Sequence, residues 1–538
     1  MREILTASQM KKCDAYTSEY FGIEPVVLME RAALTTFISI CNCGKMYEDS
    51  RTLVVCGTGN NGADGLALAR IMYEGGYSAD YCIPFDGGKH SELFERQKDI
   101  LDKYGLVPVS KDALEDGYDI VVDALFGIGL NRPLTDVAAL FIDKLNHFKG
   151  FRVALDIPSG INADTGSVMG SAFRADITVT FGFAKRGQIL FPGKDYVGKL
   201  LIANIGITER SLAWLDEEGG QQGRCFVMEK EDVIGSLPVR PDDGNKGTFG
   251  KVLIYAGNED ISGACVLASI AALKSGAGMV KVITRSGNAD ILKKTVPEAM
   301  VTTLRSKAAS AGEISETKEK IRQDIAWADV ILAGPGIGTG EESSRLLGFL
   351  LENAGDKPFV LDADALNIIS AGDRERSGQD FREIIQRRSA VTIFTPHIGE
   401  LSRLTGKSAT ELKSDIIKCS NEYAADAGVI LAAKDAVTCV SDGSKAVLVS
   451  TGNNGMATAG SGDVLAGIIA ALVAACAKTE KYEAFTAVLN AVYIHGLAGS
   501  ACLDNMAEDS VTAGDIIISL PGVIKEIRDE QKNNQAEV

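Results

Sequence analysis

The residues best suited to chemistry form a run of small residues, TGNNGMATAGSGD, which ends at Asp463. Glycines leave backbone N–H groups free to contact an anion, and the N-terminus of a following helix favours negative charge. Asp463 would stand beside a bound phosphate as a base that takes a proton from an attacking hydroxyl. The pattern therefore predicts phosphate transfer to a small molecule. An N-cap aspartate on a core helix is the alternative.

Four shorter motifs in the same half follow predicted strands. Lys434 could reach nucleotide phosphates, and 334–338 (GPGIG) is a second glycine loop. Asp362 and Asp364 suit either a magnesium ion or hydrogen bonds within a turn. His397 precedes a predicted helix, where ligand contact and a structural role are both open. The chain has no GxxxxGK[ST] motif, which excludes a P-loop enzyme.

A third glycine loop, GTGNNGADG at 57–65, follows an apolar strand in the first half. Its glycines match GxGxxG and Asp80 lies about twenty residues on, so a Rossmann dehydrogenase is an alternative for this half. Asp123 and Asp156 each close an apolar strand, and strand ends of an open sheet converge on its ligand crevice. Together with nearby asparagines and Ser159 they could hold a hard cation or perform acid/base work. Each aspartate could instead cap a turn.

Short apolar runs alternate with helical stretches along the chain, and these elements must position the residues named above. The alternation predicts an α/β fold with mainly parallel sheets. The predicted strands are 52–56, 80–83, 120–123, 152–156, 177–181, 252–256, 280–284, 330–333, 359–362, 391–394 and 429–432, with a helix over 65–74. The apolar run 464–477 predicts a buried helix, since it is short of the ~20 residues of a membrane span. The polar end from about 526 is expected to fray.

Length and composition limit the possible classes. A chain of 538 residues favours two or more domains. We expect one domain at 1–214, a polar Gly-rich linker at 215–224 and a second domain at 225–538. The net charge of −17 disfavours nucleic acid as a partner. The 11 cysteines lack metal-site spacing and the N-terminus has no apolar signal region, so we expect reduced thiols in a cytoplasmic protein.

The first half resembles the NAD(P)H-hydrate epimerase family through GTGNNGADG, DALFGIGL, DIPSG and FGFAKRG. The resemblance covers roughly 1–210 and implies a Rossmann-like three-layer α/β/α domain. It implies potassium ligation by Asn61, Asp123 and Ser159, and acid/base roles for Asp156 and Lys185. The family usually has glycine at the position of Ala63. The residues implied to bind the hydrated cofactor are Asn60, Asn61, Gly62, Ala63, Asp64, Gly127, Ile128, Gly129, Leu130, Asn131, Arg132, Pro133 and Asp156.

The second half resembles the ribokinase-like superfamily and, within it, the ADP- or ATP-dependent NAD(P)H-hydrate dehydratases. The motifs that carry this resemblance are KGTFGKVLIYAGN, AGPGIG, LDADALN, TPHIGE, GNNGMATAGSGDVLAG and IHGLAG, spread over 226–525. The family usually has asparagine at the position of Phe394. The resemblance implies substrate contacts by Ala264, Gly336, His397 and Asp463, with Asp463 catalytic. The residues implied to bind the nucleotide are Lys434, Asp435, Ala436, Val437, Thr438, Asn453, Asn454, Gly455, Met456, Ala457, Thr458, Ala459, Gly460, Ser461 and Gly462.

Together the two resemblances imply repair of nicotinamide cofactors. The first domain would interconvert the R and S hydrates of NADH or NADPH. The second would dehydrate the S form through a phosphorylated intermediate, using ADP or ATP. The implied cofactors are K⁺ and Mg²⁺, and we expect a homo-oligomer with neither nucleic acid nor membrane as a partner. The alternative is a small-molecule alcohol kinase behind a dinucleotide-binding domain.

Overall fold

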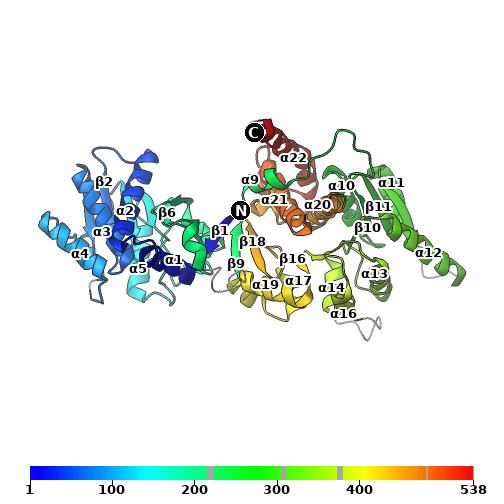
Figure 1. Ribbon diagram of the computed structural model, residues 1–538, viewed down its shortest axis with the longest axis horizontal. Helices are drawn as coiled ribbons and strands as arrows, with labels where there is room; N and C mark the ends of the chain where they lie inside the picture. The colour runs from blue at the N-terminus through cyan, green and yellow to red at the C-terminus, as the bar shows by residue number, and fades with distance from the viewer. Residues whose placement is uncertain (86, 215–222, 305–310, 372–379, 480–482, 537–538) are drawn as a thin grey trace. The chain divides into compact units, whose positions relative to one another are not determined.

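A computed structural model describes residues 1–538 except 86, 215–222, 305–310, 372–379, 480–482 and 537–538. The chain forms two compact units (Figure 1). One is Glu3–Cys225, and the other is Phe226–Val538 together with Met1–Arg2. The linker predicted at 215–224 lies outside the described residues except for Gly223 and Arg224.

The N-terminal unit contains a six-stranded sheet in which every neighbouring pair is parallel, in the order β3-β2-β4-β5-β6-β8. A separate parallel pair joins β1 (Arg2–Leu5) to β7 (Ala184–Lys185). The strand order reverses between β2 and β4, and open α/β sheets bind ligands at such a switch point. The sheet strands are β2 (Arg51–Cys56), β3 (Ser78–Cys82), β4 (Ile120–Ala124), β5 (Phe151–Leu155), β6 (Ile177–Phe181) and β8 (Lys199–Ala203).

Helices cover both faces of this sheet, so the predicted three-layer fold is confirmed. Alternate strand residues point to opposite faces. Val54 and Val122 join one core cluster with α2 and α3, whereas Leu53 and Val121 join another with α5. The helical segments are α1 (Ala7–Glu19), α2 (Pro25–Asn42), α3 (Asn60–Glu74), α4 (Glu92–Lys103), η1 (Lys111–Ala113), α5 (Asp136–Asn146), α6 (Arg186–Ile189), α7 (Lys194–Val197) and η2 (Glu209–Leu212).

The C-terminal unit is built on a sheet in the order β12-β11-β10-β13-β14-β15-β16-β17-β18-β9. The pairs from β12 to β16 are parallel, whereas β17 is antiparallel to both of its neighbours. The strands are β9 (Arg224–Val227), β10 (Lys251–Tyr255), β11 (Met279–Arg285), β12 (Met300–Leu304), β13 (Val330–Ala333), β14 (Phe359–Leu361), β15 (Thr392–Phe394), β16 (Ile430–Ala433), β17 (Thr438–Ser441) and β18 (Lys445–Val449).

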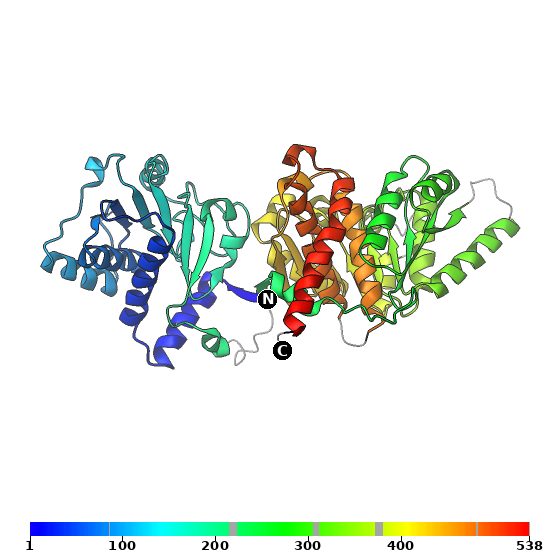
Figure 2. The same cartoon turned by 90° about the horizontal axis from the view of Figure 1, so that it is seen from above.

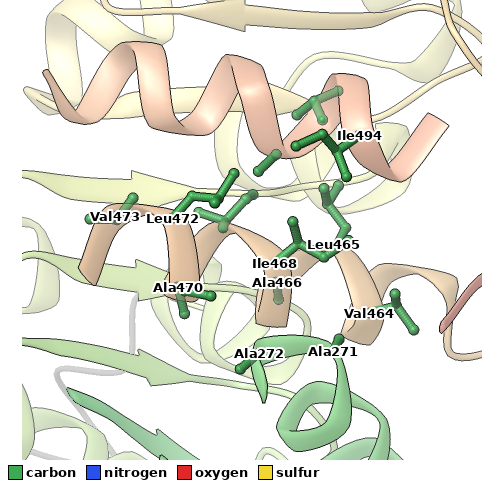
Figure 3. Close-up of a cluster of buried hydrophobic side chains, with 14 of the residues drawn as sticks. Ala271, Ala272, Val464, Leu465, Ala466, Ile468, Ala470, Leu472, Val473 and Ile494 are labelled. Carbon is green, nitrogen blue, oxygen red and sulfur yellow. The ribbon is translucent and has the colours of Figure 1, made fainter. Parts of the chain in front are cut away.

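Helix α20 forms the centre of the core of this unit and lies between α10 and α21 (Figure 3). It contains the apolar run predicted to be a buried helix, and that prediction is confirmed by its burial. The helical segments of the unit are α9 (Lys230–Ser236), α10 (Gly263–Lys274), α11 (Ser286–Thr295), α12 (Ala311–Trp327), α13 (Glu341–Asn353), α14 (Asp364–Ser370), α16 (Phe381–Arg387), α17 (Ile398–Thr405), α18 (Ala409–Ser414), α19 (Ile416–Ala427), η3 (Asn454–Met456), α20 (Ser461–Cys476), α21 (Ala484–Cys502), η4 (Glu508–Ser510) and α22 (Ala513–Ala536).

The prediction that the chain frays from about residue 526 is wrong. Residues from Glu526 to Ala536 continue α22, which packs along α21 (Figure 2). Ile527 is fully buried, and the Gln531 side chain donates hydrogen bonds to the carbonyl oxygens of Ile234 and Leu237. The polar composition reflects the exposed face of an amphipathic helix, because single apolar residues at helical spacing are enough to anchor it.

Helix α21 is a feature that the sequence reading overlooked. Within the described residues it is the one helix long and apolar enough to cross a membrane by length and composition, and 78% of its span is buried inside the protein. Core helices of soluble proteins pass the same test. All 11 cysteines are free thiols, and most are buried.

Candidate functional sites

A cavity of about 1030 Å³ opens at the switch point of the N-terminal sheet. The loops after β2 and β4 form much of its wall, as expected for residues at the carboxyl ends of parallel strands. The predicted residues that line it are Asn60, Asn61, Asp64, Gly127, Ile128, Gly129, Leu130, Asn131, Arg132, Pro133, Asp156 and Lys185.

Two of the residues predicted to contact the cofactor, Gly62 and Ala63, do not line the cavity. Ala63 is fully buried, packs in the core, and donates its N–H to the Gly59 carbonyl oxygen. A Cβ atom on Gly62 would lie 1.7 Å from the Gly57 carbonyl oxygen, so this glycine is required by close packing. Both residues lie on the side of the loop that packs against the protein, whereas other residues of the loop line the cavity.

Asp156 and Lys185 form an ion pair at the cavity wall. Lys185 is fully buried, and its ammonium group also donates to Thr180 Oγ1 at 2.8 Å and to the Phe181 carbonyl oxygen at 3.2 Å. Asp156 has φ of 63°, a left-handed conformation that is costly for a non-glycine residue. A strained backbone held by a buried cation fixes the direction of this carboxylate.

Two further carboxyl groups line the same cavity. Burial raises the pKa of Asp64 well above its ordinary value, and the charges of Asp156 and Asp14 raise it further. Burial likewise raises the pKa of Asp14 to about 7, while Lys185 lowers it and Asp156 raises it. Asp14 was missed from the sequence because it lies within α1, away from the strand ends that the motifs mark.

The residues predicted to bind a cation, Asn61, Asp123 and Ser159, carry buried polar groups. Asp123 is fully buried and accepts hydrogen bonds from Ser159 N at 2.7 Å, from the Ser159 hydroxyl at 2.6 Å, and from Leu125 N at 3.2 Å. Burial raises its pKa to about 6, and no cationic side chain pairs with it among the described residues. Both amide atoms of Asn61 are buried without a hydrogen-bonding partner in the described part of the chain. Buried polar groups without partners are rare, and a bound ion is one explanation.

Asp80 does not take the role that a dehydrogenase motif would give it. Its carboxylate accepts from the Tyr118 hydroxyl at 3.0 Å and pairs with Arg51 at 3.5 Å. It is also absent from the residues that line the cavity. The acidic residue of the Rossmann alternative is therefore engaged elsewhere.

The motifs of the C-terminal unit meet at the carboxyl ends of its parallel strands. The loops that begin at 334, 362, 395 and 434 each follow a parallel strand, β13 to β16. His397 and Lys434 form an isolated parallel bridge, with the Lys434 N–H donating to the Pro396 carbonyl oxygen at 2.8 Å. Asp364 accepts from the Gly338 N–H at 2.8 Å and so ties two of the loops together.

The side chain of Lys434 lies beneath the first turn of α20. Its Nζ atom donates to Asp362 Oδ1 at 2.8 Å, and Asp362 also accepts from Thr395 Oγ1 at 2.7 Å. A Cβ atom on Gly462 would lie 3.1 Å from this Nζ atom. The glycine therefore brings the helix N-terminus close to a lysine that is already paired.

Asp463 stands in the first turn of α20, whose N-cap Gly460 has φ of 88°. Burial raises the pKa of Asp463 to about 7, and Asp362 raises it while Lys434 lowers it; Asp364 and Glu400 raise it further. A carboxyl group with a pKa near neutrality suits a general base. Three neighbouring carboxylates and one lysine thus act on the charge of Asp463.

Part of the glycine run has a structural role that the sequence did not reveal. The Asn453 side chain donates to the Gly499 carbonyl oxygen at 2.8 Å and accepts from the Gly455 N–H at 2.9 Å. A Cβ atom on Gly499 would lie 2.2 Å from the sulfur of Met456. The first half of the run thus packs on α21. The contact with Lys434 comes from the second half of the run, at Gly462.

The remaining predicted residues occupy several environments. Ala264 and Gly336 touch, since a Cβ atom on Gly336 would lie 3.0 Å from that of Ala264. Asp435 and Ala436 are exposed in the turn between β16 and β17, whereas Val437 is buried. His397 is 56% exposed, and its Nδ1 accepts from the N–H groups of Gly399 and Glu400 as the N-cap of α17.

Phe394 and His495 are two further residues in or beside the motifs of the C-terminal unit. Phe394 is buried in a separate cavity beside Tyr423, with neither His397 nor Asp463 in its lining, so this position does not face the predicted ligand contacts. His495 lies 3.3 Å from the Ser461 hydroxyl. Burial lowers its pKa to about 4 and Lys434 lowers it further, so it is neutral at physiological pH. It was visible in the sequence only as part of IHGLAG.

The fold and the sites define an α/β protein of two units, the second a ribokinase-like unit with a carboxylate at a glycine-rich helix start. The family described as NAD(P)H-hydrate dehydratase matches residues 252–521, and that described as YjeF-related protein N-terminus matches 25–187. A bifunctional NAD(P)H-hydrate repair enzyme of Thermofilum pendens is 33% identical over 539 residues, covering 98% of this chain and 97% of that protein. Its counterpart in Moorella thermoacetica is 32% identical over 543 residues, covering 98% and 97%.

The chain belongs to the family of bifunctional NAD(P)H-hydrate repair enzymes. The prediction of an epimerase half and a dehydratase half is therefore confirmed. Among solved structures, the ADP/ATP-dependent NAD(P)H-hydrate dehydratase of Bacillus subtilis, co-crystallised with ATP/Mg²⁺, is 27% identical with a TM-score of 0.46. It covers 56% of this chain and 98% of its own.

Proposed function

We propose that the cavity of the N-terminal unit is the epimerase site and that the first turn of α20 is the site of dehydration. The hydrated nicotinamide ring would bind against Asp156, with the rest of the dinucleotide along the loops at 58–64 and 125–135. The volume of the cavity, about 1030 Å³, and the presence of Asp14, Asp64, Asp156 and Lys185 among its ionisable side chains support this placement. Asn61, Asp123 and Ser159 would hold a potassium ion, which would offset the buried charge of Asp123 beneath the cavity.

In the C-terminal unit, ADP or ATP would bind with its phosphates at 457–462 and beside Lys434. First-turn N–H groups of a helix lack intrahelical acceptors, and they attract anions. Mg²⁺ would bind together with the nucleotide, near Asp362, Asp364 and Glu400. It would offset the negative charge of the phosphates. Asp463 would take the proton of the ring hydroxyl, so that this oxygen attacks the terminal phosphoryl group.

Phosphorylation serves dehydration because a neutral hydroxyl is a poor leaving group and phosphate is a good one. The observation that carries this assignment is Asp463, with a pKa near 7, in the first turn of α20 beside the Lys434–Asp362 pair.

The experiment is to give the purified full-length protein a mixture of R and S hydrates with ADP or ATP. NADH is followed by its near-ultraviolet absorbance. The proposal expects NADH recovery beyond the amount of S hydrate supplied. Accumulation of a stable phosphorylated hydrate, with no NADH, would contradict it.

A further inference from the structure

The carboxyl group of Asp14 is placed for chemistry but belongs to no motif. It projects from α1 into the epimerase cavity, whose lining it shares with Asp64, Asp156 and Lys185. It is half-buried, and within the described residues no hydrogen bond holds it. Polar groups removed from water are normally paired, so an unpaired one in a cavity is available to a ligand.

The charged groups around Asp14 come from several elements. Lys185 of β7 is already committed to Asp156, so it leaves Asp14 without a cation of its own. Burial, Asp156 and Asp14 all raise the pKa of Asp64 of α3. The other charged side chains of the cavity lining are Lys11, Glu19 and Arg132.

We propose that Asp14 is a catalytic residue of the epimerase, acting as proton donor opposite Asp156 as proton acceptor. The inference rests on the proposed placement of the epimerase site in this cavity. The two carboxyl groups reach the cavity from different elements, α1 and the end of β5, so they can act on different faces of one ring. Their surroundings also differ. Asp156 is paired with the ammonium group of Lys185, whereas Asp14 has no such partner among the described residues and burial raises its pKa to about 7.

The chemistry follows from the structure of the hydrate. Water adds to an enamine at the carbon next to nitrogen, so the hydroxyl-bearing carbon is bonded to the ring nitrogen. Asp14 gives its proton to the hydroxyl as the C–O bond breaks, and the bonding pair leaves with water. The nitrogen lone pair forms a C=N bond, which leaves an iminium ion.

Inversion is completed by a second water molecule that attacks the opposite face. A new C–O bond forms, the C=N π pair returns to nitrogen, and the surplus proton passes to Asp156. One water is released and one is consumed, and Asp156 has gained the proton that Asp14 lost. Proton exchange with solvent restores the starting state, and the same steps in reverse convert S to R.

The test uses full-length Asp14→Asn with pure R hydrate and no nucleotide, and the epimers are separated by chromatography. General acid catalysis contributes about 100-fold or more, so kcat for R-to-S conversion should fall by at least that factor with little change in KM. In the wild type the rate should decline as pH rises above about 7, and this decline should vanish in Asp14→Asn. Glu24→Gln, which removes an exposed carboxylate without a side-chain capping bond, is the matched control. Dehydration of pure S hydrate should be unchanged.

A wild-type rate in Asp14→Asn would overturn the proposal if Asp156→Asn is inactive, and would leave the site itself in place. Wild-type rates in both variants would show that the cavity is not the epimerase site. If Asp14→Asn fails to fold, Asp14→Glu decides: a slower rate that still declines above pH 7 supports the role, and a full rate without that decline overturns it. In ¹⁸O-water each inversion should introduce one labelled oxygen. S product that keeps its original oxygen would overturn C–O cleavage.

Discussion

The Nζ atom of Lys434 lies 2.8 Å from Oδ1 of Asp362, and both adjoin Gly462 in the first turn of α20. Asp362 is only 2% exposed and Lys434 19%, so this ion pair is largely withdrawn from water. One lysine therefore has two tasks: it neutralises a buried carboxylate and supplies positive charge where the nucleotide phosphates are proposed to bind.

Lys434→Met should separate these tasks. Loss of one partner of a buried pair leaves the other charge unpaired, at a cost of about 3–5 kcal/mol. We expect urea denaturation to show destabilisation approaching this range in the C-terminal transition. Adding Asp362→Asn to Lys434→Met should restore much of the lost stability, because a neutral amide needs no cation. Nucleotide affinity should stay low in both variants, and its recovery in the double variant would contradict a phosphate role for Lys434.

Asp463→Asn should leave nucleotide binding nearly intact while S-hydrate dehydration falls by about 100-fold or more, the usual contribution of a general base. The amide keeps the size of the side chain but cannot accept the substrate proton. Calorimetric titration with ADP and an S-hydrate assay measure the two effects. R-to-S conversion by the same preparation reports whether the protein is intact. Dehydration at the wild-type rate would exclude Asp463 as the base.

The raised pKa of Asp463 predicts opposite trends for activity and stability. Dehydration requires the ionised carboxylate, so kcat/KM should rise with pH and level off above about 7. Between its ordinary value of 3.8 and about 7 the folded state holds more protons at this site than the unfolded state. The contribution of Asp463 to stability is therefore lost as pH rises through this window, by at most about 1.4 kcal/mol per pH unit.

Asp463→Asn removes this titration, so its Tm relative to the wild type should be higher at pH 8 than at pH 4. Thermal unfolding at several pH values measures the difference. A constant offset across the range would show that the pKa of Asp463 is not raised.

Much of the fold was predictable because parallel strands with both faces buried read as continuous apolar runs. The strands that carry the motifs all appear within a residue or two of their predicted limits. Strands such as β1, β7 and β17 were missed, because strands of two to four residues are too short to show an apolar pattern. The apolar periodicity of α22 was likewise hidden by its polar exposed face.

The sites were predictable where residues follow strands and unpredictable where they come from elsewhere. Asp156 and Asp463 were found from their strand-end and helix-start positions. Lys185 was found only through the family resemblance, because its complete burial depends on the tertiary pairing of β7 with β1. Asp14 contacts the cavity only because α1 packs over it, and helix packing has no local sequence signal. Asn453 carried a phosphate-loop signature, yet its amide is committed to α21.

Potassium should stabilise the N-terminal unit through Asn61, Asp123 and Ser159. An ion that binds only the folded state raises its stability, by about 2.7 kcal/mol at 100 times the dissociation constant. We expect the Tm of the N-terminal transition to rise with KCl more than with tetramethylammonium chloride at equal ionic strength. In Asp123→Asn the site loses its charged ligand, so the two salts should give equal Tm values and R-to-S conversion should collapse. Dehydration of S hydrate by the same variant should be unaffected. A K⁺-specific rise in Tm that persists in Asp123→Asn would place the ion elsewhere, because the only charge of the proposed site would then be dispensable.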